Sequence, residues 1–255
     1  MQKIINSFLI CFYMLIFSGC ADTKIKTAHD LNMTGITDAD AKKKRFFDFM
    51  RTIVIDENAK ILSLREKLLA AKKNNNKKTF VGKTAYDYNV VWEAGKENWD
   101  QLLGRVDAIA LEVALAQSAN ESAWGQSRFA MEGNNFFGQW CYIEGCGMVP
   151  DKREAGTKHE VARFKSVNAS VRSYIKNINT GTVYAPLRNI RKINRAAGKE
   201  PDAYAQAGGL IKYSQRREEY IKEIRSIIQA NKAQMLGQET ASDNRISSLF
   251  LSGQQ

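Results

Sequence analysis

The stretch from Leu115 to Trp140, LAQSANESAWGQSRFAMEGNNFFGQW, most constrains what this chain can fold into. It begins as an alanine- and leucine-rich segment and places Glu121 four residues before Gly125, which predicts a helix that stops there. A Gly-Asn-Asn turn then leads into a cluster of aromatic residues. Apolar residues recur at three- and four-residue steps from Ile109 to Ala119, so this helix is expected to pack one face into a core.

Glu121 is a carboxylate beside a tryptophan, Trp124, at the end of this predicted buried helix. Such surroundings remove water from the charged form of a carboxyl group and raise its pKa. A carboxylic acid with a raised pKa is what glycoside cleavage needs as a general acid. The stretch is therefore compatible with a glycosidase acid at Glu121, and a surface or helix-end glutamate is the alternative.

The motifs of the chain resemble those of a known family. ANESAWGQSRFA followed by GNNFFGQWC is similar to the glucosaminidase domains of the Bax-like and flagellar peptidoglycan hydrolases. The similarity continues in order through GCGMVP, HEVARF, SVRSYIKNINT and YSQRREEYIKEI, between Arg45 and Lys232. Of the two branches, the Bax-like one is the more similar.

This resemblance implies a lysozyme-like domain of two lobes, mainly α-helical with a small β-hairpin lobe (α+β). It implies an endo-β-N-acetylglucosaminidase that cuts peptidoglycan after N-acetylglucosamine, with Glu121 as the catalytic acid. A lytic transglycosylase or muramidase using the same glutamate is the alternative enzyme. The alternative that is not an enzyme is a lipoprotein that binds the cell wall without catalysis. Chitin and glycoproteins are alternative substrates for the enzyme.

The second catalytic group is open between several candidates. The family places a carboxylate in the β lobe, where Glu160 lies in the best-matching motif and Glu154 fits better by its distance from the helix. The acetamido group of the substrate can also act in place of a second carboxylate. Tyr213 matches a tyrosine that the family directs into the cleft, although packing at a helix start explains it equally well.

Five further residues are candidates for contact with substrate, with core packing as the alternative for the aromatic ones. They are Gln117, Trp124, Asn135, Phe137 and Trp140. The chain departs from the family pattern at Ala123, where glycine is usual, and we expect this change to be tolerated within a helix. It also carries Gln215 and Arg217 after Tyr213 instead of the usual Glu and Gly.

Residues 1–19 have the features of a lipoprotein signal peptide. A short basic start precedes an apolar run from Ile4 to Phe17, which is too short for an ordinary membrane span. Two small residues then precede Cys20, the expected lipidation site, and residues 20–36 are expected to be a polar linker. The alternatives are a conventional cleaved signal or an uncleaved anchor. Lipidation predicts a protein of the cell envelope, anchored in the outer membrane and facing the periplasm.

The net charge of +11 suits an anionic polymer or surface. Export makes nucleic acid an improbable partner, so peptidoglycan with its peptide carboxylates is the expected polyanion. A solvated basic surface with no dedicated partner is the alternative. We expect a monomer and no cofactor.

The four cysteines separate into two groups. Cys11 lies in the signal peptide and Cys20 at the lipidation site, which leaves Cys141 and Cys146 to form a disulfide in an oxidising periplasm. No metal site is expected, because the sequence has two histidines and no second cysteine pair.

The remaining boundaries follow from hydrophobic periodicity. Residues 37–78 are predicted to be an N-terminal helical extension, because Phe47, Val54, Ile61 and Leu68 repeat every seven residues. This extension is one long helix or two helices broken near residues 56–58. After the polar run KKNNNKK, the glucosaminidase domain is expected over residues 79–235, followed by a polar tail over residues 236–255.

Overall fold

The computed structural model of the chain describes residues 25–75, 79–151, 153, 156–199 and 202–238. The predicted signal peptide with Cys20, the catalytic candidate Glu154 and residues 239–255 of the predicted tail lie outside this part. The described residues are mainly helical with one small sheet, which confirms the predicted fold class. None of the described helices is long and apolar enough to cross a membrane.

The elements follow one another along the chain with these bounds: η1 (Ala28–Leu31), α1 (Ala39–Lys73), α2 (Thr79–Asp87), α3 (Trp99–Arg105), α4 (Leu111–Glu121), α5 (Arg128–Gly133), β1 (Trp140–Cys141), β2 (Gly147–Met148), β3 (Glu160–Ala162), α6 (Val167–Thr180), η2 (Thr182–Tyr184), α7 (Ala185–Ala196), α8 (Ala203–Gly208) and α9 (Glu218–Leu236).

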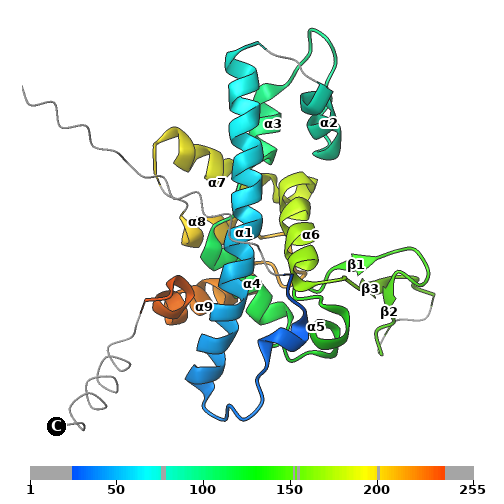
Figure 1. Cartoon of the computed structure of the whole chain (residues 1–255), viewed down its shortest axis with the longest axis vertical. Helices are drawn as coiled ribbons and strands as arrows, with labels where there is room; N and C mark the ends of the chain where they lie inside the picture. Colours follow the sequence, from blue (N-terminus) through cyan, green and yellow to red (C-terminus); the bar gives the residue numbers. More distant parts are fainter. Residues whose placement is uncertain (1–24, 76–78, 152, 154–155, 200–201, 239–255) are drawn as a thin grey trace, which may run out of the picture.

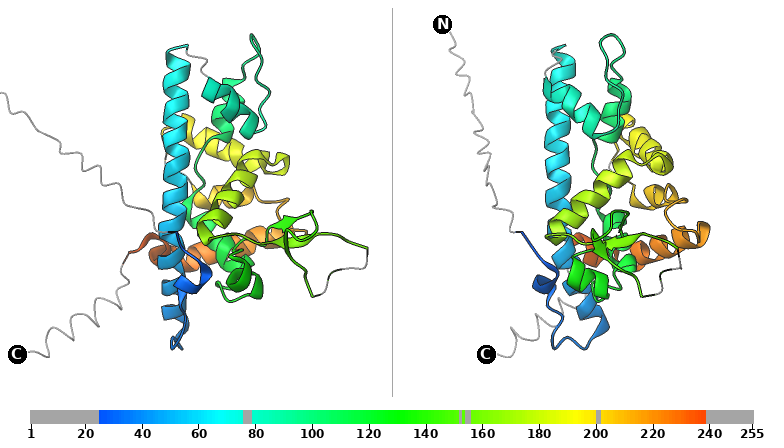
Figure 2. Two further views of the ribbon diagram at one scale, coloured as in Figure 1. Left: turned by 45° about the vertical axis from the view of Figure 1, so that its right-hand side comes forward. Right: turned by 90° about the vertical axis from the view of Figure 1, so that its right-hand side faces the viewer.

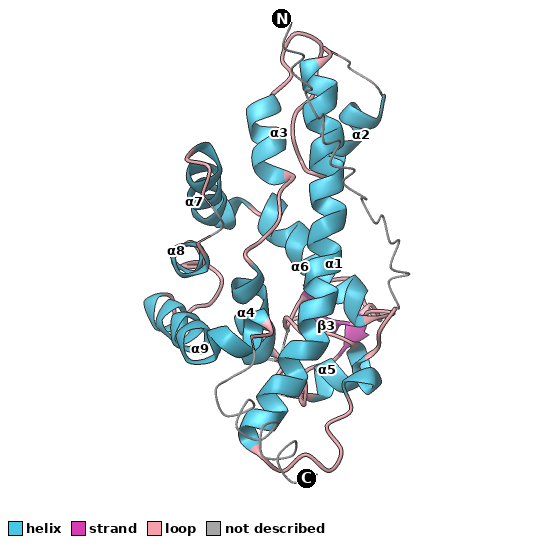
Figure 3. Cartoon of the chain, turned by 60° about the vertical axis from the view of Figure 1, so that its left-hand side comes forward, coloured by secondary structure: helices cyan, strands magenta, loops and turns pink. Residues whose placement is uncertain are grey.

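Helix α1 is one continuous helix that extends along the whole body of the protein (Figures 1 and 3), so the break considered near residues 56–58 does not occur. The Asp38 side chain caps its start by accepting a hydrogen bond from the backbone N–H of Ala41 at 2.7 Å. Phe47 in its first half and Leu68 near its end are both fully buried. The helix therefore belongs to the interior of the fold.

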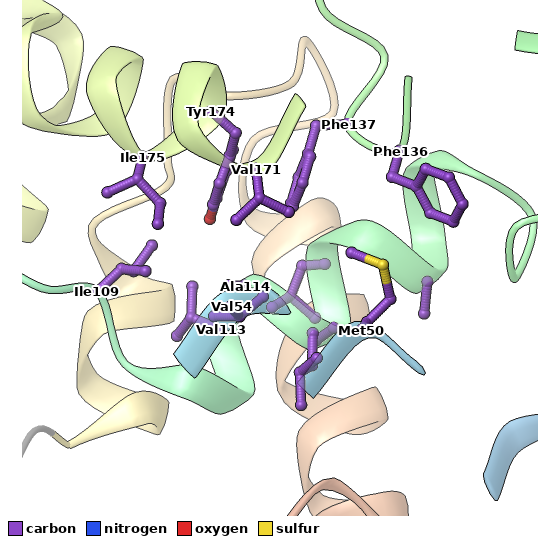
Figure 4. Packing of buried hydrophobic residues seen from close by; sticks show 14 of the residues in the cluster. Met50, Val54, Ile109, Val113, Ala114, Phe136, Phe137, Val171, Tyr174 and Ile175 are labelled. Carbon is purple, nitrogen blue, oxygen red and sulfur yellow. The ribbon is translucent and has the colours of Figure 1, made fainter. Parts of the chain in front are cut away.

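Buried side chains form two clusters, and Ile61 of α1 packs against both. The main cluster lies between α1, α4, α6 and α9, and Figure 4 shows part of it. Its largest members include Phe46, Phe47, Met50, Leu115, Phe136, Phe137, Tyr174 and Tyr220. The second cluster lies between the end of α1, α2 and α3, and includes Leu68, Val81, Leu102 and Val106.

Residues 25–36 do not form the polar linker that the sequence predicts. Ala28 and Leu31 of η1 are buried in the main cluster. The backbone N–H of Ala28 donates to Oδ1 of Asn134 at 2.7 Å, and Val167 N–H donates to the carbonyl of Lys26 at 2.8 Å. The segment is thus held against α5 and α6 by apolar burial and by paired backbone groups.

The predicted β lobe is a three-stranded antiparallel sheet in the order β1-β3-β2 that projects from the helices (Figure 2). Trp140 pairs with Val161, and Gly147 pairs with Ala162. A side chain at Gly147 would place its Cβ 2.1 Å from the carbonyl oxygen of Val161, so only glycine permits this approach of β2 to β3. The lobe stands next to the end of α4, where Glu121 lies.

The connection from α3 to α4 is fixed by a buried arginine of α7. Arg191 donates to the carbonyls of Asp107 and Ala108 at 3.0 and 2.9 Å, and to Gly104 at 2.8 Å. The carboxylate of Asp107 binds Arg195 of the same helix. These bonds hold the loop before α4 and so fix where the helix that carries Glu121 begins.

Candidate active site

Glu121 is the last residue of α4, so the helix ends four residues before Gly125, where the sequence predicts its end. The Ser122 hydroxyl donates to the carbonyl of Ser118 at 2.5 Å and accepts from the N–H of Gly125 at 2.7 Å. Ala123, Trp124 and Gly125 then take φ angles of 50°, 58° and 78°. The expectation that Ala123 sits within a helix is therefore wrong, since it begins a left-handed turn that is unfavourable for alanine.

A cleft of about 820 Å³ lies between the end of α4, the β lobe, α6 and the start of α9. Polar groups and aromatic rings share its walls. The residues that line it are Asn120, Glu121, Phe137, Gly138, Gln139, Trp140, Tyr142, Ser173, Asn177, Tyr184, Tyr213, Ser214, Arg216 and Tyr220. Four of the sequence-predicted site residues, Glu121, Phe137, Trp140 and Tyr213, meet in this cleft.

Burial raises the pKa of Glu121 above its ordinary value. Hydrogen bonds from Tyr220 and Asn120 and the positive charge of Arg216 oppose this rise without cancelling it. Gly138 lies beside the second carboxylate oxygen, since a Cβ built there would stand 3.5 Å from Oε2. The absence of a side chain at Gly138 thus leaves space beside Oε2.

A chain of buried hydrogen bonds determines the role of each oxygen of Glu121. Tyr174 Oη donates to Oε1 of Gln117 at 2.6 Å, and Nε2 of Gln117 donates to Oη of Tyr220 at 2.9 Å. Tyr220 then donates its single proton to Oε1 of Glu121 at 2.8 Å. Because Oε1 accepts this bond, Oε2, the oxygen beside Gly138, is better placed to carry the acidic proton of Glu121.

Aromatic rings stack along the cleft. Phe137 lies flat on Tyr174 with ring centroids 3.9 Å apart (Figure 4), and Tyr213 stacks on Tyr220 at 5.3 Å. The Tyr213 hydroxyl donates to the carbonyl of Phe137 at 3.1 Å and so ties these two walls together. Trp140 is 57 % exposed and stacks on His159, which offers a flat face at the mouth of the cleft.

Three predicted substrate contacts have structural roles instead. Trp124 is not among the residues that line the cleft, and its ring packs edge-on against Phe46 and Phe47. Gln117 is fully buried within the hydrogen-bonded chain described above. Asn135 is also buried, and its amide donates to the carbonyls of Gln139 and Ala162 at 2.9 and 2.8 Å, which joins the turn to β3.

Glu160 is also held away from the cleft lining. Its two oxygens accept hydrogen bonds from the backbone N–H groups of Gly145 and Gly147 at 3.0 and 2.7 Å. These bonds lower the pKa of Glu160 below its ordinary value. This carboxylate therefore closes the loop between β1 and β2. Among the described residues that line the cleft, Glu121 is the sole carboxylate.

The predicted disulfide joins Cys141 and Cys146 at the base of the same loop, where it leaves β1 and enters β2. Within the described part, these two sulfurs and a Glu160 oxygen lie within 4.8 Å of one another. Such a group resembles a metal site in its composition, but metal binding by cysteine requires thiolates. The disulfide removes them, so the arrangement serves to brace the loop.

Several cleft residues were not predicted from the sequence, namely Tyr174 beneath the wall and Tyr184, Tyr220 and Arg216 in the lining. Tyr220 occupies a core-facing position of an amphipathic helix, and its ring is indeed buried. Only its hydroxyl reaches Glu121, and helical periodicity cannot reveal that. The sequence signal for Tyr220 was its place in the motif YSQRREEY, which draws attention to Tyr213 first.

Comparison with known proteins identifies the family of the chain. The sequence profile of the glucosaminidase family, described as mannosyl-glycoprotein endo-beta-N-acetylglucosaminidase, matches residues 96–233. Protein bax of Escherichia coli (strain K12) is 30 % identical over 196 residues, which cover 74 % of this chain and 70 % of that protein. No solved structure matches significantly. The chain belongs to the glucosaminidase family, which indicates a glycosidase that acts on glycans.

Proposed function

We propose that the protein is an exported peptidoglycan hydrolase, an endo-β-N-acetylglucosaminidase that cuts the glycan after N-acetylglucosamine. The observation that carries the proposal is Glu121 at the cleft, with a raised pKa, one oxygen occupied by Tyr220 and the other beside Gly138. A carboxylic acid in this state can give its proton to a glycosidic oxygen. Trp140 and Tyr142 at the same cleft supply flat faces for sugar rings.

In the proposed reaction, Oε2 of Glu121 protonates the leaving oxygen as the bond from that oxygen to the anomeric carbon breaks. Because Glu121 is the one carboxylate among the described cleft residues, the acetamido oxygen of the substrate is the favoured nucleophile. It forms a bond to the anomeric carbon and gives a cyclic oxazolinium. Water then opens this ring and returns a proton to Glu121, which acts as the base in the second step.

We also propose that the protein is lipidated at Cys20 and acts as a monomer in the cell envelope, on the outer membrane facing the periplasm. The leader sequence supports lipidation. The Cys141–Cys146 disulfide is compatible with an oxidising compartment. The net charge of +11 suits an anionic wall polymer. Labelling of the protein with a radioactive or alkyne fatty acid, lost on Cys20→Ala, tests the anchor.

The test of the activity is digestion of purified peptidoglycan by the soluble protein, residues 21–255, beside its Glu121→Gln variant. Released fragments are reduced with borohydride and identified by mass spectrometry. We expect reduced N-acetylglucosamine ends from the wild type, and a loss of about 10²- to 10⁴-fold in the variant. If neither protein releases fragments while both sediment with the wall, the protein is a wall-binding lipoprotein.

A lytic transglycosylase is the second candidate, and the single described carboxylate of the cleft is the observation that favours it. In that reaction a hydroxyl of the substrate itself replaces water, so one glutamate suffices. The products distinguish the two enzymes. Anhydromuramic ends would assign the transglycosylase and keep Glu121 as the acid, whereas reducing muramic ends would assign a muramidase.

A further inference from the structure

A second hollow, of about 510 Å³, lies between α1 and α6, which run side by side (Figure 1). We name it the α1–α6 groove. It is lined by Glu57, Lys60, Ile61, Leu64, Tyr88, Ala169, Arg172, Ser173 and Lys176. None of these residues carries a role in the proposed hydrolysis.

The groove and the cleft meet at α6. Ser173 lines both hollows, with Asn177 on its cleft side and Arg172 and Lys176 on its groove side. The opposite face of α6, with Val171 and Tyr174, is buried in the core. Helix α6 is therefore a ridge with the cleft along one flank and the groove along the other.

The groove combines an apolar floor with a basic rim. Ile61, Leu64 and the ring of Tyr88 supply apolar surface, and the Lys176 ammonium lies 3.6 Å from the centre of that ring. Burial lowers the pKa of Lys176 below its ordinary value. Desolvation of this kind makes contact with an anion more favourable than it is for a fully solvated lysine.

A buried carboxylate orients the other basic groups of the rim. Glu57 is 2 % exposed and accepts two hydrogen bonds from the fork of Arg172, each at 2.9 Å. Lys60 contacts Glu57 at 2.9 Å and Asp56 at 2.6 Å. The Arg172 side chain is still 60 % exposed, so its outer edge faces solvent. Three cations thus line a groove whose own lining holds one carboxylate.

We propose that the α1–α6 groove binds the acidic peptide attached to the glycan strand that occupies the cleft. The inference rests on the proposed function and adds a peptide subsite to it. Charge complementarity supports it, since wall peptides carry carboxylates and short aliphatic side chains that match the basic rim and the apolar floor. Distance supports it too: four extended residues span about 13 Å, and a helix with its side chains is about 10–12 Å across.

The experiment measures sedimentation of the Glu121→Gln protein with two insoluble substrates. One is the intact wall, and the other, called the stripped wall, is glycan freed of its peptides by an amidase and coupled to beads. Lys176→Gln and Lys176→Glu are added to this background, and Lys192→Glu serves as the matched control. Lys192 is an exposed lysine of α7 outside both hollows. Retained thermal melting of each variant confirms that it folds.

We expect Lys176→Gln to weaken binding to intact walls by about two- to fivefold, as the loss of one partly exposed charge contact does. Lys176→Glu should weaken it further, and added salt should shrink the difference. Binding to stripped walls and the Lys192→Glu control should not change. Equal loss on both walls, or no loss on intact walls, would overturn the peptide subsite.

Binding needs no turnover, so this measurement separates the two proposals. A wild-type protein that releases no fragments, but holds intact walls through Lys176, would keep the subsite and overturn the hydrolase. A protein that cleaves intact and stripped glycan equally well, with and without Lys176, would keep the hydrolase and overturn the subsite.

Discussion

Tyr220 donates its phenolic proton to Oε1 of Glu121 at 2.8 Å, and Gln117 favours this direction by donating to the same phenol oxygen at 2.9 Å. The bond stabilises the charged carboxylate, and so it opposes the burial that raises the pKa of Glu121. The proton of the acid is thereby directed to Oε2 without any contact between Gln117 and the carboxylate.

Tyr220→Phe should raise the pKa of Glu121 further, because burial remains and the opposing hydrogen bond is lost. A general acid works only while it is protonated, so the alkaline limb of the pH profile of kcat/KM should move to higher pH. The maximal kcat/KM of this variant should fall far less than the kcat/KM of Glu121→Gln, for which we expect a loss of about 10²- to 10⁴-fold. Tyr213→Phe is the control, since that hydroxyl bonds the carbonyl of Phe137 and should leave the limb in place.

Glu121→Gln should melt at a higher temperature than the wild type at pH 7. Burial raises the pKa of Glu121 above its ordinary 4.5, so the charged carboxylate destabilises the folded protein at pH values above that. Below about pH 4.5 the carboxyl group is protonated in both the folded and the unfolded wild type, so the difference in melting temperature should vanish. Thermal melts of both proteins between about pH 4 and pH 7 measure the sign of the difference in melting temperature. The control is Glu66→Gln at an exposed position of α1, which should change the unfolding free energy by less than about 0.5 kcal/mol. If Glu121→Gln melts at a lower temperature than the wild type at pH 7, this prediction is wrong.

Glu160→Gln should lower the melting temperature at pH 7, because one of the two backbone N–H groups would face the amide nitrogen. The pKa of Glu160 is lowered in the folded protein, so its stabilisation is present above the ordinary value of 4.5 and is lost as pH falls below it. The gap between variant and wild type should therefore narrow in acid. Turnover per folded molecule should be kept, whereas its loss in a well-folded variant would restore Glu160 as a catalytic carboxylate.

Ala123→Gly should stabilise the protein by about 0.5–1 kcal/mol, because a left-handed conformation costs alanine about 1–2 kcal/mol and glycine loses part of this gain as chain entropy. The φ of Ala123 is 50° and its side chain is exposed, so no packing is sacrificed. Ala59→Gly, at an exposed helical position of α1, is the matched control and should destabilise by about 1 kcal/mol. Urea unfolding measures both, and destabilisation by Ala123→Gly would show that the turn is not strained.

The sequence motifs predicted that Glu121, Phe137, Trp140 and Tyr213 lie at one site, and they predicted the disulfide. They did not predict which motif residues line the cleft and which support it from behind. Gln117 and Trp124 stand in the same motif as Glu121 but have structural roles. Gln117 donates to the phenol that bonds Glu121, and Trp124 packs against Phe47. A motif records that a residue is required and does not record whether it touches the substrate. Tyr220 was hidden for the converse reason, since its ring obeys the core pattern and only its oxygen enters the site.

The helical class was predictable because apolar periodicity along α1, α4, α6 and α9 is strong. The left-handed turn after Glu121 was not, because Ser-Ala-Trp contains no residue that favours positive φ. The docking of residues 25–36 was missed for a similar reason. Two small apolar contacts, Ala28 and Leu31, fix that segment, and such a pair has no detectable period in a polar stretch.

Helix α1 has a practical consequence for anyone who isolates the catalytic region. The family profile begins at residue 96, yet Phe46, Phe47 and Met50, which precede that boundary, are buried in the main cluster with residues of α4 and α9. A fragment cut at residue 96 would expose the apolar faces of α4 and α9 to water and would aggregate before its activity could be assayed. Fusion proteins and domain swaps with other hydrolases must therefore include the chain from residue 25 onward together with the residues that the family profile matches.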